Sequence, residues 1–305
     1  MRVLLWTDME GMSRVTDHRQ CWPVFPHYWA TGRRAFTDET VAAAEGLLEG
    51  GAAEVFVVNG HGLGWPNLLE DELPAGSMAP DDEAWGEGFD AMFQVGFHSR
   101  AGTPDGFMSH TLVPGLAVLV DGEPVTECQI WAWLQGVEVL GVVGDAALED
   151  QLEPGLAATR FLAVKHSTSR TRTTPTHRDP KDSAHAIRGF ARRCVAERIG
   201  RLPLLPERFT LTVSMDPALV PRAEGKHGLT RTSESELSVD ATDWAHDAYP
   251  ALQDAMDAAL VPLRAAGEGQ LDLTTEAAMK AQEGEALDRY RAFFVAWAES
   301  HELVR

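Results

Sequence analysis

The opening stretch MRVLLWTDMEG constrains the fold of this chain more than any other part of the sequence. Residues 3–6 form a short apolar run, typical of a buried strand, and the run ends abruptly at Asp8 and Glu10. Ligands of open α/β sheets bind beyond the carboxyl ends of the strands, so these two acids fit a cation site. A solvated turn with a helix-capping aspartate is the alternative interpretation at this point.

The same pattern returns twice more within the first third of the chain. An apolar run at 54–58 leads into NGHG, which contains His61, and a run at 91–96 leads into FHSR, which contains His98. A single histidine in a loop is more often a hydrogen-bonded structural residue than a metal ligand. Successive strands that each deliver a side chain of metal-ligand type favour instead a shared site at one edge of a sheet.

The remaining periodicity predicts an α/β protein with a mostly parallel central sheet and flanking helices. Further strands are expected at 116–120, 137–143, 161–165, 209–215 and 236–239, and helices at 37–50, 180–199, 244–263 and 275–300. The proline-containing stretch 201–206 is the expected boundary. We therefore expect a metal-binding catalytic α/β domain over 1–203 and a smaller α+β carboxyl-terminal domain, ending in a helix, over 204–305.

Two aromatic segments need an interpretation of their own. Residues 13–36 are rich in aromatic side chains and contain prolines that oppose regular structure, so we expect a long loop that acts as a lid or binding loop. The last predicted helix carries an apolar stripe at helical spacing, which we expect to serve core or subunit packing. The stripe consists of Leu287, Tyr290, Phe293, Phe294 and Trp297.

Composition excludes several classes of function. The chain has 26 Lys and Arg against 46 Asp and Glu, a formal net charge of -20, so an extended phosphate-binding surface and a nucleic-acid partner are not expected. No stretch approaches the roughly 18 apolar residues of a membrane span, and the early acids interrupt any secretion signal. We expect a cytoplasmic protein without membrane contact. Cys21, Cys128 and Cys194 lack the spacing of a zinc knuckle and are expected to be reduced thiols.

The mixture of carboxylates and imidazoles indicates the kind of metal. Such donors suit zinc, with manganese, cobalt or iron as alternatives, and the absence of thiolates argues against a structural zinc site. Asp8 is short enough to bridge two ions about 3.5–4 Å apart, an arrangement that activates a water and polarises a substrate carbonyl. Glu127, on the helix expected after the strand at 116–120, is placed to complete the second ion's shell.

Five blocks of the sequence resemble, in order and approximate spacing, the signature blocks of the DppA-type zinc D-aminopeptidases. The blocks are TDMEG at 7–11, NGHG at 59–62, GFHSRAG at 96–102, MSHT at 108–111 and Glu127. The resemblance continues through Lys165 and Arg170 and covers most of the chain before its carboxyl-terminal segment. The order of all five blocks makes the family assignment stronger than the assignment of a substrate.

The resemblance implies a role for each matching residue. Asp8, Glu10 and His61 match the ligands of one zinc ion, and Asp8, His98 and Glu127 match those of a second, with Asp8 as the bridge. His110 matches an active-site histidine that is not a ligand. A free imidazole beside a binuclear site suits general acid–base catalysis or attack on the carbonyl. Its alternative is a serine–histidine pair that ties a loop down.

The sequence also departs from the family pattern at three positions. Asn59, Val41 and His166 differ from the residues expected there, which affects the choice of substrate rather than the metal ligands. Lys165 and Arg170 match the family pattern and are expected to bind a substrate carboxylate or to line the pocket, although charged runs in loops are usually solvated.

The sequence thus predicts a binuclear zinc aminopeptidase, with two Zn²⁺ as cofactors, that releases an N-terminal residue, of D configuration by resemblance, from short peptides or aminoacyl amides. The alternatives are a metal-dependent hydrolase of a non-peptide amide or other small molecule, and a metal-binding assembly protein without turnover. Family members form self-compartmentalising rings, so the resemblance also implies a homo-oligomer, whose entrance the aromatic segment 22–29 would help to form.

Overall fold

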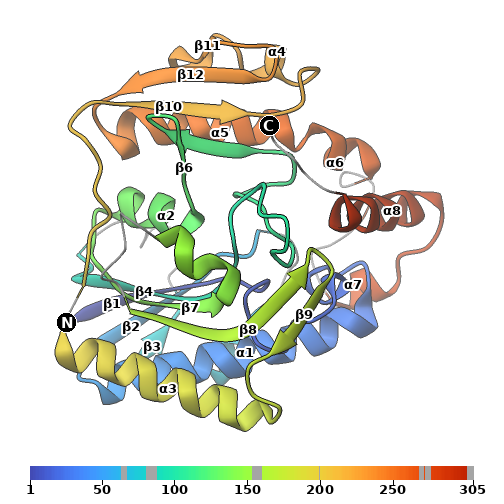
Figure 1. Cartoon of the computed structure of the whole chain (residues 1–305). Helices are drawn as coiled ribbons and strands as arrows, with labels where there is room; N and C mark the ends of the chain where they lie inside the picture. The colour runs from blue at the N-terminus through green and yellow to red at the C-terminus, as the bar shows by residue number, and fades with distance from the viewer. Residues whose placement is uncertain are drawn as a thin grey trace.

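A seven-stranded sheet forms the base of the molecule in the computed structural model, which describes residues 1–62, 67–79, 88–152, 160–198, 200–267, 271 and 276–300 (Figure 1). The strand order is β3-β2-β1-β4-β7-β8-β9. All neighbours are parallel except β8 and β9, which form an antiparallel hairpin. The strands are β1 (Arg2–Thr7), β2 (Glu54–Asn59), β3 (Ser77–Met78), β4 (Ala91–Phe97), β7 (Val139–Asp145), β8 (Arg160–Ser169) and β9 (Arg172–Pro175). The mostly parallel sheet predicted from the sequence is confirmed.

The strand order creates a crevice at the carboxyl end of β1. From β1 the chain adds β2 and β3 on one side, and then returns to add β4 on the other side. The loops that follow β1 and β4 therefore leave the sheet in different directions. This change of direction is where ligands bind in open α/β sheets. The sequence blocks at residues 7–11 and 96–102 lie at this point.

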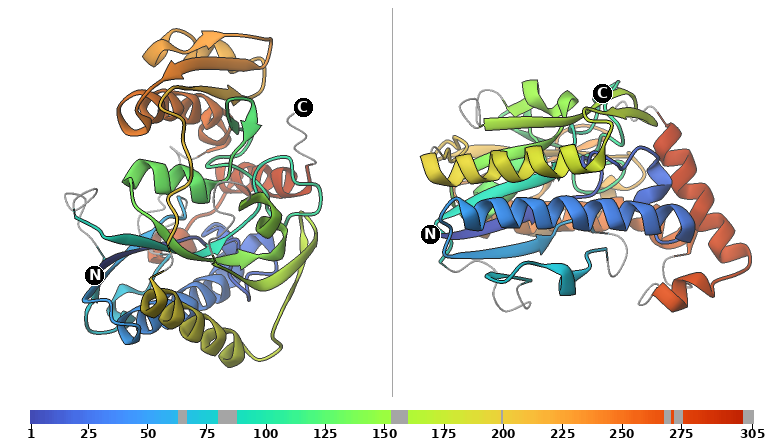
Figure 2. Two further views of the ribbon diagram at one scale, coloured as in Figure 1. Left: turned by 60° about the vertical axis from the view of Figure 1, so that its left-hand side comes forward. Right: turned by 90° about the horizontal axis from the view of Figure 1, so that it is seen from below.

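Two long helices cover one face of the parallel sheet. Helices α1 (Pro26–Glu49) and α3 (Pro180–Glu197) lie side by side beneath it (Figures 1 and 2). They pack on the apolar side chains of the central strands, for example Leu5 and Phe93, which are fully buried. Helix α8 (Glu285–Glu299) joins the same core through buried side chains of the predicted stripe, namely Leu287, Tyr290, Phe294 and Trp297. The expected packing role of the stripe is thus realised in the core of the chain.

A second, antiparallel sheet covers the opposite side of the molecule. Its order is β11-β12-β10-β5-β6, with β5 (Ala117–Val120), β6 (Glu123–Pro124), β10 (Phe209–Ser214), β11 (Thr230–Arg231) and β12 (Glu236–Ala241). Helices α4 (Val220–Ala223), α5 (Tyr249–Ala259) and α6 (Val261–Ala266) follow its strands. Strands β5 and β6 precede the predicted domain boundary after residue 203, so this sheet combines segments from both sides of it.

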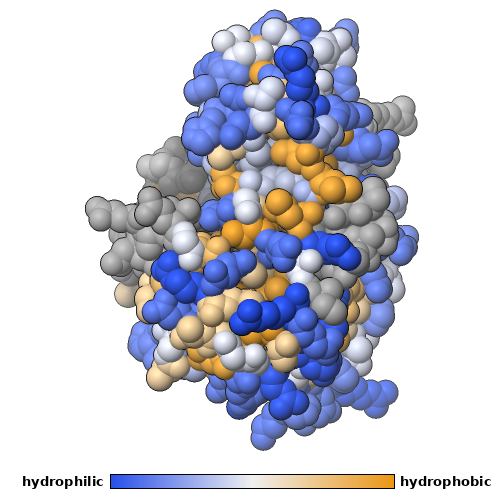
Figure 3. Space-filling model, turned by 90° about the vertical axis from the view of Figure 1, so that its left-hand side faces the viewer, coloured by the Kyte–Doolittle hydropathy of each residue, from blue (hydrophilic) through white to orange (hydrophobic). Residues whose placement is uncertain are grey.

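Helix α2 (Glu127–Gln135) lies between the two sheets. Its Cys128 and Ala132 face the core above the parallel sheet, whereas Ile130 and Trp133 belong to the core of the second sheet. The connection from α3 to β10 spans the two layers on the face shown in Figure 3, where apolar surface gathers between them. The two layers therefore share one helix and several apolar contacts.

Some element boundaries differ from the sequence expectation. Residues 13–36 are not an irregular loop as expected. The segment contains η1 (His18–Cys21), and α1 begins within it at Pro26. Pro26 occupies the first turn of α1, where its missing N–H costs no helical hydrogen bond. Thr37 is therefore inside the helix, and its hydroxyl donates to the carbonyl of Arg33 at 3.0 Å.

The carboxyl-terminal helices are shorter than expected. The predicted helix 244–263 is divided into the π-helical turn η6 (Trp244–Ala248), α5 and α6. The last predicted helix is divided into α7 (Glu276–Lys280) and α8, because Gly284 takes a φ of 95° just before α8. Its expected first residue, 275, lies outside the described residues, as does 199, the expected end of α3. The remaining short helices are η2 (Glu70–Glu72), η4 (Ala146–Leu152) and η5 (Lys226–Gly228).

Two further expectations can be compared with the structure directly. None of the helices in the described parts of the chain is long and apolar enough to cross a membrane. Cys21, Cys128 and Cys194 are buried free thiols, as expected.

Candidate metal centre

The structure brings the five predicted metal ligands together at the crevice beside β1. Asp8 and Glu10 follow β1, His61 follows β2, His98 follows β4, and Glu127 begins α2. Nδ1 of His61 lies 3.1 Å from Oε2 of Glu10 and 3.4 Å from Oδ1 of Asp8. Nε2 of His98 lies 3.2 Å from Oδ2 of Asp8 and 3.7 Å from Oε1 of Glu127. The two carboxylate oxygens of Asp8 thus face two different imidazoles.

Each imidazole of the cluster is oriented by one hydrogen bond to the backbone. A carbonyl only accepts, so the ring nitrogen beside it carries the proton and the other nitrogen is left to face the carboxylates. Histidines that bind metals are commonly fixed in this way. The bonds run from His61 Nε2 to the Cys21 carbonyl (2.9 Å), from His98 Nδ1 to the Ser99 carbonyl (2.9 Å), and from His110 Nδ1 to the Met108 carbonyl (2.7 Å).

Glu127 is positioned by the start of α2. Thr126 caps the helix and forms a capping box with Gln129, which makes Glu127 the first helical residue. The positive end of the helix favours a carboxylate there. The backbone N–H of Leu112 donates to Oε1 of Glu127 at 2.6 Å. Glu127 is therefore held from two sides, with its carboxylate near His98 and His110.

The donor set fits a metal ion. Asp8 Oδ2, Glu10 Oε1 and His98 Nε2 are buried polar atoms without a hydrogen-bond partner among the described residues, and leaving such groups unpaired costs free energy. The candidate ligand atoms form two groups, and within each group all atoms lie within 4.8 Å of one another. One group is made by Asp8, Glu10 and His98, and the other by His98, His110 and Glu127. Carboxylates and imidazoles without thiolates suit zinc in a catalytic rather than a structural site.

In the metal-free protein, the imidazoles and carboxylates hold one another in charged forms. Burial opposes protonation of His98, but the carboxylate of Asp8, 3.2 Å away, and the charge of Glu127 outweigh it and raise the pKa of His98 to about 10. Burial also opposes protonation of His61, yet the charge of Glu10 and the bond to Asp8 raise its pKa well above 6.5. Burial raises the pKa of Glu127 to about 7, against the opposing charge of His98.

These shifts predict that metal binding releases protons. A metal needs neutral imidazoles, whereas His61 and His98 are protonated in the metal-free protein at pH 7 because their pKa values are raised. We expect about two to three protons to leave per fully loaded site, one from each of these imidazoles and a fraction from Glu127, whose pKa is about 7. The apparent metal affinity should rise about tenfold per pH unit for each proton displaced. Calorimetry of zinc binding in buffers of different ionisation enthalpy measures this number. A heat that does not depend on the buffer would contradict the prediction.

His110 lies beside the cluster in a different electrostatic state. Burial, together with the charge of His98, lowers the pKa of His110 well below 6.5, so its imidazole is neutral at pH 7. Its ring stacks on that of His98, with centroids 4.1 Å apart. Because Nδ1 donates to the carbonyl of Met108, the lone pair is on Nε2, 3.9 Å from Oε1 of Glu127. His110 is therefore a neutral imidazole beside the cluster, with its lone pair turned toward Glu127.

A cavity of about 280 Å³ opens onto the cluster. Its polar side contains Asp8, Glu10, His61, His110 and Glu127, and its other walls are largely apolar. The apolar residues are Trp22, Leu112, Val113, Pro114, Trp131, Met256, Leu260 and Trp297. A small cavity with convergent polar groups and apolar walls is typical of a site for a small molecule.

Lys165 and Arg170 are buried and are not among the residues that line this cavity. The Lys165 ammonium donates to the backbone carbonyls of Glu10 and Val15, and burial lowers its pKa to about 8. Arg170 Nη1 donates to the Ser109 carbonyl and, at 2.9 Å, to its hydroxyl. The stretch that contains them forms the β8–β9 hairpin rather than a solvated loop. Their contacts fix the backbone around Glu10 and His110, and a role in binding substrate remains a prediction.

Most of the cavity walls have no distinct signal in the sequence. Trp131 lies one turn after Glu127 on α2, a spacing that the sequence does show, and Trp22 packs beside His61 with ring centroids 5.5 Å apart. Met256, Leu260 and Trp297 come from the carboxyl-terminal helices, and no local pattern distinguishes them from other core residues. Their position depends on how the second sheet and α8 pack.

Close backbone contacts between the loops after β1 and β4 set the position of Asp8. Gly96 has a φ of 84°, and a Cβ atom there would lie 1.8 Å from the Asp8 carbonyl oxygen. Gly11 is equally restricted, since its Cβ would lie 1.9 Å from the Phe97 carbonyl oxygen. Only glycine at both positions lets the two loops approach this closely.

We therefore expect Gly96→Ala to lower the free energy of unfolding and to displace Asp8. A positive φ alone costs about 1–3 kcal/mol for a side chain that cannot adopt it, and the contact with the Asp8 carbonyl adds to this. Urea denaturation measures the loss. Gly62→Ala is a suitable control, because a Cβ at Gly62 meets no atom of the described residues within 4 Å. Equal stability of the two variants would contradict the argument.

An α/β fold with a buried cluster of carboxylates and imidazoles at its crevice is that of a metal-dependent hydrolase. A family model described as D-aminopeptidase (peptidase M55) matches residues 1–253, and the chain belongs to this family. The family membership confirms the enzyme class expected from the sequence blocks, a metallo-aminopeptidase.

The fold is similar to that of a solved structure, the Zn-dependent D-aminopeptidase DppA from Bacillus subtilis, which is described as a self-compartmentalizing protease. The TM-score is 0.76 with 23% sequence identity, over 86% of this chain and 98% of the other. No curated protein sequence matches this chain significantly.

Proposed function

We propose that this chain is a binuclear zinc aminopeptidase that releases the N-terminal residue, of D configuration, from short peptides and aminoacyl amides. The observation that carries the proposal is the position of Asp8, whose two oxygens lie 3.4 Å from His61 Nδ1 and 3.2 Å from His98 Nε2. A carboxylate that faces two anchored imidazoles is placed to bridge two ions. The family supports the activity, and the zinc dependence described for the DppA structure supports the metal.

The proposed ligands divide into two sets that share Asp8. Asp8, Glu10 and His61 would hold one ion, and Asp8, His98 and Glu127 would hold the other. His110 is close enough to His98 and Glu127 to be counted with them geometrically. We assign it to proton transfer rather than to the metal, because the resemblance matches it to an active-site histidine that is not a ligand.

The chain's own residues then perform the proton transfers. When bound, the metal ions polarise the substrate carbonyl and lower the pKa of water. His110 is neutral at pH 7, so its Nε2 accepts a proton as water attacks the carbonyl and returns it to the leaving amine. The Met108 carbonyl stabilises the resulting imidazolium, because it accepts from Nδ1 at 2.7 Å. The apolar walls limit the water that reaches this step.

The proposal is tested by the hydrolysis of paired D- and L-aminoacyl amides and dipeptides. Zinc-loaded protein is compared with a chelated sample and with the chelated sample after zinc is restored. We expect metal-dependent cleavage with a preference for the D series. Retention of two metal ions without cleavage of any member of the panel would favour the alternative, a hydrolase of a non-peptide amide or another small molecule.

We also propose that the chain assembles into a homo-oligomer. The DppA structure is described as self-compartmentalizing, which supports such an assembly here. Light scattering is expected to give a mass that is a multiple of 33.3 kDa at micromolar concentration. A monomer under these conditions would contradict the proposal, and the metal centre would be unaffected by that result.

A further inference from the structure

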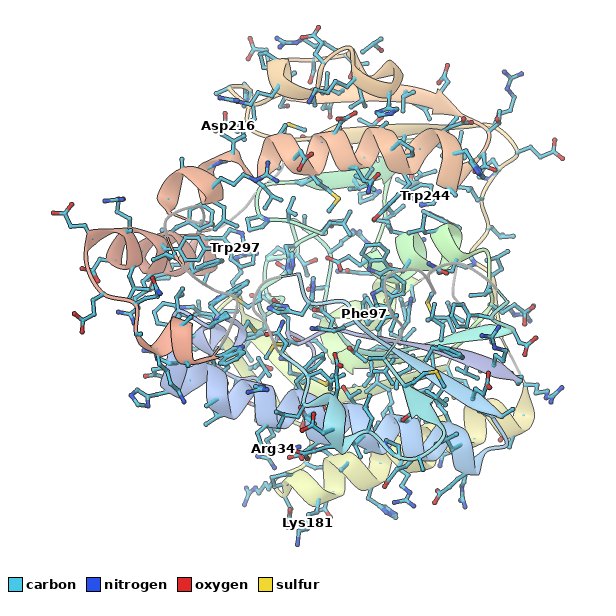
Figure 4. All side chains as sticks on the ribbon, turned by 180° about the vertical axis from the view of Figure 1, so that it is seen from behind. Arg34, Phe97, Lys181, Asp216, Trp244 and Trp297 are labelled. Atoms are coloured by element: carbon cyan, nitrogen blue, oxygen red, sulfur yellow. The ribbon has the colours of Figure 1, made fainter. Side chains whose placement is uncertain are left out.

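Part of the cavity is built by residues outside the segment that matches the family. The family match ends at residue 253, whereas Met256, Leu260 and Trp297 all line the cavity. Met256 lies on α5, and Leu260 immediately follows it. Trp297 lies on α8, at the end of this helix that adjoins the rest of the molecule (Figure 4). The segment beyond the family match therefore shapes the space above the metal centre.

Trp297 is held firmly against the polar side of the cavity. Its ring meets that of His110 edge to face, with centroids 5.3 Å apart, and that of Trp22 with centroids 5.7 Å apart. The guanidinium of Arg170 also lies over the indole, with Cζ 5.5 Å from the ring centroid. Only 5% of Trp297 is exposed. An aromatic wall with this many contacts is preorganised rather than adaptable.

The second aromatic wall is fixed by the same helix. Trp22 stacks on Phe294 of α8, with ring centroids 4.2 Å apart and an angle of 18°. The guanidinium of Arg291 on α8 donates to the Val24 carbonyl at 2.7 Å, which ties the helix to the segment that carries Trp22. Helix α8 therefore supplies one wall of the cavity and holds the other in place.

The charges around the cavity indicate which part of a peptide enters it. The described lining residues include three carboxylates, Asp8, Glu10 and Glu127, and no lysine or arginine. None of these described lining residues is a cation that could pair with the carboxylate of a leaving residue. A volume of about 280 Å³ holds about one residue rather than a folded chain. The enclosed space thus suits the N-terminal residue of the substrate.

From these observations we infer that the cavity is a subsite for a large apolar side chain, aromatic or branched, on the N-terminal residue, and that Trp297 determines this selectivity. The inference rests on the proposed aminopeptidase activity. It adds a substrate class, peptides and amides with N-terminal residues such as phenylalanine or leucine rather than alanine. The aromatic walls lie next to His110 and His61, so an apolar side chain bound between them would lie beside the metal centre.

The first test compares D-phenylalaninamide, D-leucinamide and D-alaninamide as substrates. We expect kcat/KM to be about 10- to 100-fold higher for the phenylalanine amide than for the alanine amide, mainly through KM. Trp297→Ala is expected to reduce this ratio to within a few-fold of one. Phe293→Ala is the matched control, because Phe293 is a half-buried aromatic residue of α8 outside the cavity lining, and it should keep the ratio. Met256→Ala tests the opposite wall if Trp297→Ala does not fold.

A second measurement separates this inference from the proposed activity. Calorimetry of D-phenylalanine and D-alanine binding to zinc-loaded protein needs no turnover, and we expect tighter binding of D-phenylalanine that depends on Trp297. If all the amides are cleaved equally well, the subsite is wrong and the aminopeptidase stands. If D-phenylalanine binds tightly but no amide is cleaved, the subsite stands and the proposed activity is wrong. Equal binding of both amino acids overturns the subsite in either case.

Discussion

Asp8→Asn is expected to remove metal from the site and to reduce kcat by about 10⁴-fold or more, since the whole catalytic unit is lost. Asn keeps the shape of the side chain and offers one carbonyl oxygen in place of a bridging carboxylate. The ring nitrogens that are not bonded to the backbone, Nδ1 of His61 and Nε2 of His98, both face Asp8, so the substitution weakens the two proposed ion sites together. Metal content after dialysis should fall from two ions per chain to less than one.

The chain offers a close control for this experiment. Asp145 is also a fully buried carboxylate at the carboxyl end of a parallel strand, β7, but its oxygens accept from Ser167 and from the N–H of Ala147. Asp145→Asn should lower the free energy of unfolding and leave two metal ions bound. If Asp8→Asn kept both metal ions, Asp8 would not be the bridge.

His110→Ala is expected to lower kcat by about 10²- to 10⁴-fold, the usual contribution of a general acid–base group, with metal content unchanged. The lowered pKa of His110 keeps its imidazole in the basic form at pH 7. Titration of His110 should therefore cause no fall in the wild-type rate between pH 8 and pH 6.5. Single-turnover kinetics with a D-aminoacyl amide, alongside metal analysis, measure both quantities.

Two outcomes would contradict the role assigned to His110. Unchanged activity with metal bound would show that it takes no part in catalysis. Loss of a metal ion would show instead that it is a ligand, a possibility raised by its position within 4.8 Å of His98 and Glu127. His166→Ala is a suitable control, because His166 is an exposed histidine on β8.

The location of the site could be predicted from the sequence because parallel strands end at one edge of a sheet. Asp8, His61 and His98 each follow an apolar run directly, and the strand order brings the three runs side by side. The same rule does not distinguish metal ligands from acids with a structural role. Asp145 obeys the pattern equally well, and only its hydrogen bonds, from the N–H of Ala147 and from Ser167 of β8, show that it holds the backbone.

The segment 13–36 shows why element boundaries were harder to predict. Its prolines suggested a loop, yet Pro26 is compatible with a helix at its first turn, and the position of the turn is decided by packing. Trp22 is buried against α8, more than two hundred residues later in the chain. Contacts of this kind have no local signal, which is why the cavity walls were not found.

The place of α2 between the two sheets has a consequence for how the enzyme responds to its substrate. Glu127 and Trp131 lie one turn apart on this helix, so the helix carries both a proposed metal ligand and a wall of the cavity. We expect a side chain pressed against Trp131 to shift the occupancy of the second ion, and that ion to change the affinity for the side chain by the same factor, because such linkage is reciprocal. Occupancy of the second ion would then depend on how well the substrate side chain fits the cavity.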